Sequence, residues 1–252
     1  MTSDVAPDAG VIDRPPVQVQ QLDWISCGLP EYDGKIALLV DNVFDNADCK
    51  RLLDTAEAVG DWSAAPLHGY RPEAQAAVVN VDHRDSGRII LDDQNLADWV
   101  LEKLRPHISQ LEIAPDPPHE YHTVQESDPK STIRLFRVNE RMRYLRYGPG
   151  QFFRTHFDGV YHTPDKVEAS YFTMQIYLSG SEEGLKGGTT RFFSTRRDRD
   201  GRRMHMDVEP VAGRVIIFQG GLLLHSGEAV KQGIKITIKT ELMYKRVPDA
   251  PV

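Results

Sequence analysis

The alternation of hydrophobic and polar residues in the first half of the chain predicts one strand and two helices. Residues 36–40 form a short, wholly apolar run bounded by polar residues, which is typical of a buried strand. Segment 45–62 places apolar residues at helical spacing between an Asp-Asn start and Gly60, which indicates a helix. Segment 92–108 repeats this spacing until Pro106 ends it, because proline cannot continue the hydrogen bonding of a helix.

The second half of the chain has a different pattern, in which short apolar or alternating runs follow one another closely. Such runs lie at 133–138, 142–147, 151–157, 171–178, 190–194, 204–211, 214–219 and 234–244. Close spacing without helical patterns in between is typical of antiparallel strands in a barrel or sandwich. We therefore expect a mainly β protein with flanking helices, in which two helices pack on the outside of a β-barrel.

Composition and charge narrow the functional classes. The 252 residues are 40% hydrophobic, which is enough for one sizeable core. The net charge of −7 makes nucleic acid an unlikely partner, because non-specific phosphate binding needs a basic surface. The two cysteines, Cys27 and Cys49, lack CxxC spacing and suggest neither a disulfide framework nor a zinc cluster.

The first residues of the chain have few large apolar side chains. Residues 1–19 cannot bury enough surface to offset the entropy of ordering, so we expect a disordered leader. They lack the apolar run of a secretory signal, and no stretch of the chain approaches the roughly 20 apolar residues of a membrane span. We expect an intracellular protein, cytoplasmic or nuclear, that does not enter a membrane.

Three histidine-aspartate pairs have a spacing that suits a metal site on a strand. Positions i and i+2 of a strand point to the same face, so His-x-Asp can present two ligands together. The pattern begins at His83, His156 and His205. The first lies in a polar run that we expect to be a loop, and the third follows a charged hairpin tip. His156 instead follows a glycine-proline turn and an aromatic run, which favours His156 and Asp158 as ligands.

A distal histidine, His225, lies in the apolar run FQGGLLLHSG, 67 residues after Asp158. A single histidine in such a run is more often a core residue, but this separation leaves room for several strands before the chain returns to the metal. Two histidines and one carboxylate form the ligand set of mononuclear Fe(II) oxygenases, which leaves other positions on the metal open. The sequence therefore predicts an iron site of His156, Asp158 and His225.

Motifs between Asn139 and Tyr244 carry a resemblance to a known family. They are RYGPGQFFRTHFDG, QIYLSG, GGTTRFF, VAGRVIIFQGGLLLHSG and GIKITIKTELMY. In this order they resemble the catalytic core of the prolyl 4-hydroxylase-like branch of the 2-oxoglutarate/Fe(II) oxygenases; DHRDSGRIILDD resembles a segment further upstream. The resemblance implies a double-stranded β-helix, a cupin-like jelly-roll barrel. We expect a single oxygenase domain over 20–252, with helical support at about 45–112 and the jelly-roll core at about 131–246.

The resemblance also implies a site for 2-oxoglutarate, whose far carboxylate needs a fixed cation. In similar proteins this cation lies on the strand after the distal histidine, where Lys235 stands ten residues past His225. The alternation in IKITIKTEL puts Lys239 on the same face, so Lys239 remains an alternative, as does a strand whose polar face meets solvent. Tyr147 and Tyr177 resemble tyrosines that line this pocket, although a buried phenol is also an ordinary core residue.

The chemistry that the resemblance implies is hydroxylation of a C–H bond with Fe(II), 2-oxoglutarate and O2, releasing succinate and CO2; ascorbate is a further candidate cofactor. The carboxylate of Asp158 disfavours halogenation, because halogenating relatives carry a small residue there. The favoured substrate is a peptidyl, prolyl-type residue. A free amino acid or other small molecule is the alternative, because one scaffold hosts several substrates. A non-redox cupin-like binding module is less favoured, since such modules usually use more histidines and lack the distant cation.

Candidates for substrate contacts lie on both sides of the iron strand. Asn139 and Arg143 precede it, and the loop 159–170 follows it. We interpret His162, within that loop, as a loop residue and not as a fourth ligand.

Two further segments are left outside the predicted site. Thr189 and Thr190 follow two glycines and favour a turn into a strand. Segment 195–203 carries five arginines around an Asp-Gly pair, which favours a solvated hairpin over a basic flap above the barrel mouth.

Overall fold

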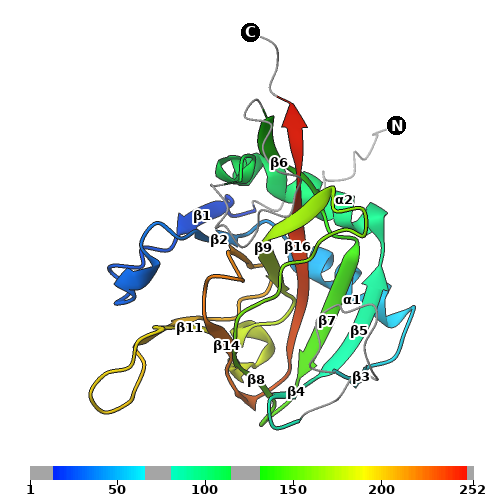
Figure 1. Cartoon of the computed structure of the whole chain (residues 1–252). Helices are drawn as coiled ribbons and strands as arrows, with labels where there is room; N and C mark the ends of the chain where they lie inside the picture. Colours follow the sequence, from blue (N-terminus) through cyan, green and yellow to red (C-terminus); the bar gives the residue numbers. More distant parts are fainter. Residues whose placement is uncertain (1–13, 66–80, 115–130, 249–252) are drawn as a thin grey trace, which may run out of the picture.

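The structure, a computed structural model, describes residues 14–65, 81–114 and 131–248, and two antiparallel sheets dominate it (Figure 1). The larger sheet has the order β1 (Gln18–Gln21), β2 (Ala37–Asp41), β13 (Val215–Phe218), β9 (Glu168–Tyr177), β16 (Lys235–Pro248), β7 (Arg141–Tyr147), β5 (Gly87–Asp92), β3 (Ser63–Ala64), and β6 (Ser131–Val138) also pairs with β16. The smaller sheet has the order β12 (His205–Val208), β11 (Thr190–Phe193), β14 (His225–Gly227), β8 (Phe152–His156), β4 (Arg84–Asp85). A separate ribbon pairs β10 (Lys186–Gly187) with β15 (Val230–Gln232).

The helices begin where the sequence places capping residues. They are α1 (Asn46–Glu57), α2 (Gln94–Leu104) and the 3-10 helices η1 (Pro30–Tyr32), η2 (Arg105–His107), η3 (Ser109–Leu111) and η5 (Ser181–Glu183). The side chain of Asp45 accepts a hydrogen bond from the backbone N–H of Asp48, and Asp93 caps α2 in the same way through Leu96. Pro106 lies just past the end of α2. Both predicted helices are confirmed, each shorter than the segment that predicted it.

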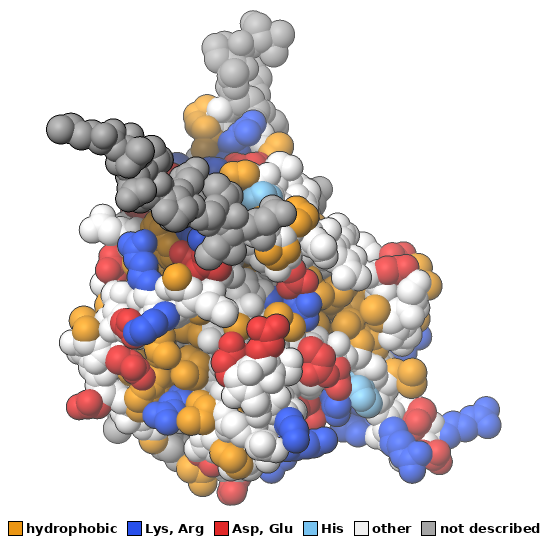
Figure 2. Space-filling model, turned by 180° about the vertical axis from the view of Figure 1, so that it is seen from behind, with side chains coloured by type: hydrophobic (Ala, Val, Ile, Leu, Met, Phe, Trp, Pro, Cys, Tyr) orange, Lys and Arg blue, Asp and Glu red, His pale blue; other side chains and the backbone are white. Residues whose placement is uncertain are grey.

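A hairpin between β11 and β12 projects from the body, and Figure 2 shows Lys and Arg side chains gathered on it. Its turn is held by the carboxylate of Asp198, which accepts hydrogen bonds from the backbone N–H groups of Asp200 and Arg202. Gly201 has a φ of +78°, a conformation that favours glycine. The predicted solvated hairpin at 195–203 is confirmed.

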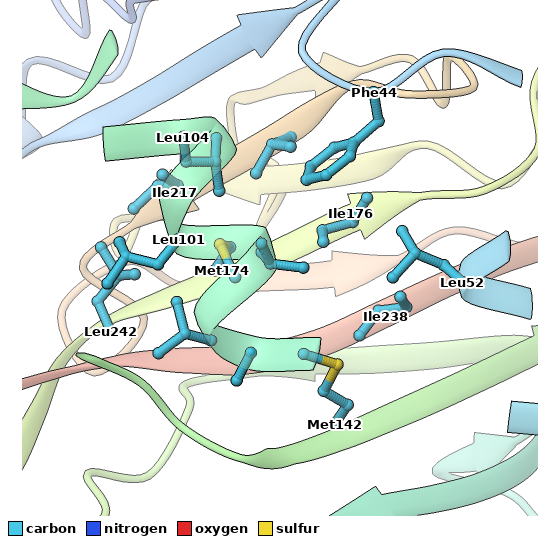
Figure 3. Close-up of a cluster of buried hydrophobic side chains, with 14 of the residues drawn as sticks. Phe44, Leu52, Leu101, Leu104, Met142, Met174, Ile176, Ile217, Ile238 and Leu242 are labelled. Carbon is cyan, nitrogen blue, oxygen red and sulfur yellow. The ribbon is translucent and has the colours of Figure 1, made fainter. Parts of the chain in front are cut away.

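The largest cluster of buried apolar side chains lies between the two helices and the outer face of the larger sheet (Figure 3). Leu101 and Leu104 of α2 belong to it together with Met174 and Ile176 of β9 and Ile238 of β16. Burying each such side chain stabilises the fold by roughly 1.5–3 kcal/mol. The even-numbered residues of these strands therefore face the helices, and the alternate residues point to the opposite side of the sheet. The predicted β-barrel with external helices is confirmed.

Strands β4 and β5 lie within segment 45–112, for which helical support was expected, and they add to the sheets beside the two helices. The polar run around His83 was expected to be a loop, yet Arg84 and Asp85 pair with β8, and β5 pairs with β7. Along β5, Ile89 and Leu91 are buried whereas their neighbours are not. In the sequence these residues form only a short apolar run, Ile89-Ile90-Leu91, and the polar residues before it concealed this strand signal.

The predicted leader also needs a correction at its end. Residues 1–13 of the leader lie outside the described residues. Gln18 and Val19 belong to β1, which pairs with β2 through backbone groups while its side chains stay exposed. Because backbone pairing needs no apolar side chain, composition carried no signal for it. Among the described helices, none has the length and apolar character needed to cross a membrane.

Candidate active site

A cavity of about 560 Å³ lies between the two sheets. Its walls come mainly from β7, β9 and β16 of the larger sheet and from β8 and β14 of the smaller one, and the loop after β8 also lines it. The apolar positions of β9 and β16 are committed to the helix side of the sheet. Their polar positions consequently face the cavity.

Three side chains with metal-binding atoms converge in this cavity. β8 and β14 pair so that His156 stands opposite His225, and Asp158 follows two residues after His156. One potential ligand atom from each residue lies within 4.8 Å of the other two. Nε2 of His156 is 3.7 Å and Nε2 of His225 is 3.6 Å from the carboxylate of Asp158. Strand pairing thus unites residues that are far apart in the sequence.

Backbone carbonyls orient both imidazole rings. Nδ1 of His156 lies 2.7 Å from the carbonyl oxygen of Arg154, and Nδ1 of His225 lies 2.8 Å from that of Leu223. A carbonyl can only accept, so in the neutral ring each Nδ1 carries the proton and each Nε2 keeps a free lone pair. The Nε2 atoms face Asp158, which is the arrangement that metal-binding histidines adopt.

The protonation states also suit a bound cation. Burial lowers the pKa of His225 to about 4, so its ring is neutral at neutral pH. Burial alone would raise the pKa of Asp158, but the charge of Lys239, with the interactions of His225 and His156, outweighs it and holds the pKa well below its usual range. Two imidazoles and one ionised carboxylate are the donor set of a mononuclear Fe(II) site, so these residues fit that metal.

Two residues that sequence reasoning missed hold Asp158 in place. The hydroxyl of Thr173 donates to the carboxylate at 2.6 Å, and the backbone N–H of Asp158 donates to the carbonyl of Gly220 at 3.0 Å. A Cβ atom at Gly220 would lie only 2.7 Å from Oδ2 of Asp158 and 2.3 Å from the hydroxyl of Thr173. Glycine at this position therefore leaves the space that the carboxylate and its donor occupy.

Comparisons with known proteins agree with this chemistry. Residues 142–240 match the family model of the 2OG-Fe(II) oxygenase superfamily. This part of the chain is a 2OG-Fe(II) oxygenase domain. A search of curated proteins gave no match.

Solved structures with the same fold include two prolyl hydroxylases. A Pseudomonas putida prolyl-4-hydroxylase is 18% identical over 87% of this chain and 99% of its own, with a TM-score of 0.52. A Trichoplax adhaerens prolyl hydroxylase, in complex with a peptide fragment of the hypoxia inducible factor oxygen degradation domain, is 12% identical over 88% of this chain and 89% of its own, with a TM-score of 0.52. The predicted jelly-roll fold of the prolyl 4-hydroxylase-like branch is confirmed. The protein is a 2-oxoglutarate-dependent dioxygenase, an oxidoreductase that uses Fe(II), 2-oxoglutarate and O2.

The other histidines considered from the sequence stand apart from the group of metal-binding atoms in the described part of this oxygenase. The ring of His83 packs edge-on against Phe153, with ring centres 5.8 Å apart. His205 is exposed on β12. His162 lines the cavity from the loop after β8, as a loop residue.

Strand β16 turns its charged face into the cavity of the oxygenase, so the solvent-facing alternative is wrong. Lys235, Thr237, Lys239 and Glu241 all line the cavity. Nζ of Lys239 lies 3.4 Å from Asp158 and 3.1 Å from Glu241. Lys235 is only 3% exposed, and no carboxylate of the described residues lies within ion-pair distance of it. Burial lowers the pKa of Lys235 to about 7.

The two tyrosines predicted for the cosubstrate pocket occupy different positions. Tyr147 lines the cavity, and Nζ of Lys235 lies 5.7 Å from its ring centre. Tyr177 is fully buried behind the wall, and its hydroxyl donates to the hydroxyl of Thr190 at 2.7 Å. Thr190 itself lines the cavity. Nζ of Lys235 also lies 5.6 Å from the ring centre of Tyr177, so Tyr177 is next to the predicted cosubstrate lysine. Thr190, which was predicted to lie outside the site, belongs to the cavity wall.

The two residues predicted to contact substrate before the iron strand also differ. Arg143 lines the cavity and donates to both carboxylate oxygens of Glu241, at 2.9 and 3.1 Å. Asn139 is buried outside the cavity wall, and its side-chain amide donates to the same carboxylate at 2.9 Å. Asn139 therefore supports Glu241 and, contrary to the expectation, does not face a substrate.

Sequence reasoning also missed two arginines of the wall, Arg84 and Arg88. They flank Ser86 in DHRDSGRIILDD, a segment that resembles the oxygenase family. The resemblance therefore pointed to this segment, but its polar residues were interpreted as a loop, so its strands were not predicted.

The restricted space at Gly220 can be tested by a substitution that fills it. Gly220→Ala should weaken Fe(II) binding about 10- to 100-fold, because the new methyl group displaces the carboxylate of Asp158 and its donor Thr173. Anaerobic metal titration would measure the affinity, and thermal unfolding would check the fold. Gly159→Ala is the matched control, since a Cβ there meets nothing within 4 Å. Equal affinities in the two variants would contradict this role for Gly220.

Proposed function

We propose that the protein hydroxylates a C–H bond of a peptidyl, prolyl-type substrate, with His156, Asp158 and His225 as iron ligands and Lys235 as the anchor of 2-oxoglutarate. The observation that carries this proposal is the convergence of two imidazoles and a carboxylate in a cavity that also holds a buried lysine, which forms no ion pair with any described residue. When bound, iron with 2-oxoglutarate and O2 supplies the oxidising chemistry, which yields succinate, CO2 and a hydroxylated product.

The protein's own contribution is to hold these groups in place. The carbonyls of Arg154 and Leu223 keep both Nε2 atoms aimed at Asp158, and Thr173 fixes the carboxylate. The cavity between the sheets shields the site from water, so the charges in it interact more strongly than they would in solvent.

Lys235 is favoured over Lys239 as the cosubstrate anchor because of their partners. Lys239 already balances the carboxylates of Asp158 and Glu241. Lys235 is buried, and a carboxylate ligand would supply the counter-charge it lacks. Tyr147 lies beside it in the cavity wall.

A peptidyl substrate is supported by the similarity in fold to prolyl hydroxylases, one of which was solved with a peptide fragment. A C–H bond can reach the iron site only on an extended or flexible segment, because the sheets enclose the cavity. The same chemistry on a free amino acid is the second candidate, and the excess of cationic side chains in the cavity favours it.

Replacing a ligand should abolish turnover. Each of His156→Ala, Asp158→Ala and His225→Ala should lower succinate formation from 2-oxoglutarate by more than about 100-fold, because each removes one of three donors. Succinate would be quantified by mass spectrometry and folding checked by circular dichroism. His83→Ala and His205→Ala serve as controls and should keep metal and activity. Full activity in any ligand variant would disprove the assignment.

The lowered pKa of Lys235 predicts how cosubstrate binding depends on pH. A carboxylate favours the charged lysine, so binding above pH 7 must take up a proton, and the Kd for 2-oxoglutarate should rise by up to about tenfold per pH unit there. Lys235→Arg should remove this pH dependence, because a guanidinium stays charged. Anaerobic calorimetry would measure both.

A pair of alanine variants separates the two lysines. Lys235→Ala should raise the KM for 2-oxoglutarate about 10- to 150-fold, the loss expected for one charge-assisted hydrogen bond. Lys239→Ala should raise it much less. The reverse ranking would make Lys239 the anchor.

Substrate class can be tested through the stimulation of turnover. Proline-rich peptides should increase succinate formation several-fold over the rate without substrate, in the presence of Fe(II), ascorbate and 2-oxoglutarate. The small-molecule fraction of a cell extract is the comparison. Stimulation by that fraction, with none by peptides, would contradict a peptidyl substrate and leave the oxygenase chemistry intact.

A further inference from the structure

Two arginines stand together on the cavity wall where the smaller sheet passes into the larger one. Arg84 lies on β4, which pairs with β8, and Arg88 lies on β5, which pairs with β7. Only three residues separate them, and both line the cavity. Arg88 stands opposite Leu145, which also lines the cavity, so both residues use the inward face of the sheet.

Neither guanidinium has a counter-ion among the residues that the structure describes. Arg84 is 9% exposed; its Nε donates to the hydroxyl of Ser86 at 3.2 Å, and its guanidinium lies 4.6 Å from the ring centre of Phe153. No carboxylate of the described ranges lies within ion-pair distance of Arg84 or Arg88. Burial, followed by the charge of Arg84, lowers the pKa of Arg88. Arg84 is buried and Arg88 is half-buried, so the pair forms a cationic cluster with no anionic partner among the described residues.

The other charged groups of the cavity already have partners or a proposed role. Arg143 and Lys239 are balanced by Glu241 and Asp158. Lys235 is assigned above to the far carboxylate of 2-oxoglutarate. It lies on β16, and β7 separates that strand from β5, so two interstrand spacings, about 10 Å, divide Lys235 from the strand of Arg88. One carboxylate cannot serve both positions.

The cation excess is local to the cavity. The whole chain has a net charge of −7, so the excess of positive charge on the cavity wall is opposite in sign to the charge of the protein as a whole. Leaving charges unpaired in a buried site destabilises the empty protein, and a bound anion relieves that cost. Guanidinium groups bind carboxylates through paired, directional hydrogen bonds, which fix orientation as well as position.

We propose that the primary substrate carries a carboxylate, which Arg84 and Arg88 bind so that its target C–H bond points to the iron site. This inference rests on the oxygenase function proposed above and adds the chemical class of the substrate. The carboxylate belongs either to a peptide, as a terminus or an acidic side chain, or to a free amino acid. The two sources present the same group to the arginines and are separated by experiment.

The test uses matched probes that differ only in the carboxylate. They are the free amino acids and their amides, and proline-containing peptides with a free or amidated C-terminus and with a Glu or Gln next to the proline. Stimulation of succinate formation is measured with the full-length enzyme. We expect at least one acid to stimulate about tenfold more than its amide, and the responding set identifies the source. Equal stimulation by acid and amide, or no stimulation by any acid, would overturn the proposal.

Variants then assign the effect to the arginines. Arg88→Gln and Arg84→Gln should each raise the KM for the active acid about 10- to 100-fold, with little change for its amide or for 2-oxoglutarate. Arg88→Lys should restore part of the affinity, because it keeps the charge. Arg146→Gln is the matched control: it lies on β7, its guanidinium stands 5.8 Å from the ring centre of Trp62, and it does not line the cavity. Unchanged KM values in both glutamine variants would refute the site.

Conversion of 2-oxoglutarate without substrate tests the oxygenase function separately from the carboxylate-binding site. This slow turnover needs the iron and cosubstrate sites alone, so the control variant Arg146→Gln should keep it. Its absence in the unmodified enzyme would refute the oxygenase function itself. Its presence, together with acids that act no better than amides, would refute only the carboxylate site.

Discussion

The carboxylate of Asp158 is ionised in the space between two sheets, and the groups around it have to balance that charge. A buried and unpaired carboxylate costs several kcal/mol. Here Lys239 and the two histidines each come within 4 Å of the carboxylate, and Thr173 donates a hydrogen bond to it. These partners come from β8, β9, β14 and β16, so the site exists only while four strands keep their registers.

The cationic side chains of the cavity fall into two groups, which differ in whether they form an ion pair with an acidic side chain of the protein. Lys239 and Arg143 are used inside the protein, where they share the carboxylate of Glu241 and link β16 to β7. Lys235 and the pair Arg84 and Arg88 face the cavity, and no carboxylate in the described part of the chain lies within ion-pair distance of them. The first group stabilises the fold around the site, whereas the second group would gain a counter-charge from the ligands proposed above. Both effects arise because charges interact more strongly in the low-polarity surroundings of the cavity than in water: paired charges stabilise the fold, and unpaired charges are costly.

Local patterns determined much of this protein from the sequence alone. The Asp-Asn start at Asp45, the end at Pro106 and the helical spacing of apolar residues identified the two helices, and short alternating runs identified the barrel. The pair His156 and Asp158 could be selected because a strand of period two presents both side chains on one face. His225 was chosen because its apolar run lies 67 residues after Asp158, and the ordered family motifs include it. Each of these signals depends on residues close in sequence or on motif order.

Only the tertiary structure decided which face of each strand points into the cavity and which residues meet there. Alternation along β16 separates Lys235 and Lys239 from the apolar face, but it cannot say that Lys239 is balanced by Asp158 while Lys235 is not. The same holds for Thr190, which lines the wall in front of Tyr177, and for Arg84 and Arg88. Strand register is set by pairing between distant segments, and burial against α1 and α2 selects the inward face. Neither constraint can be read from neighbouring residues.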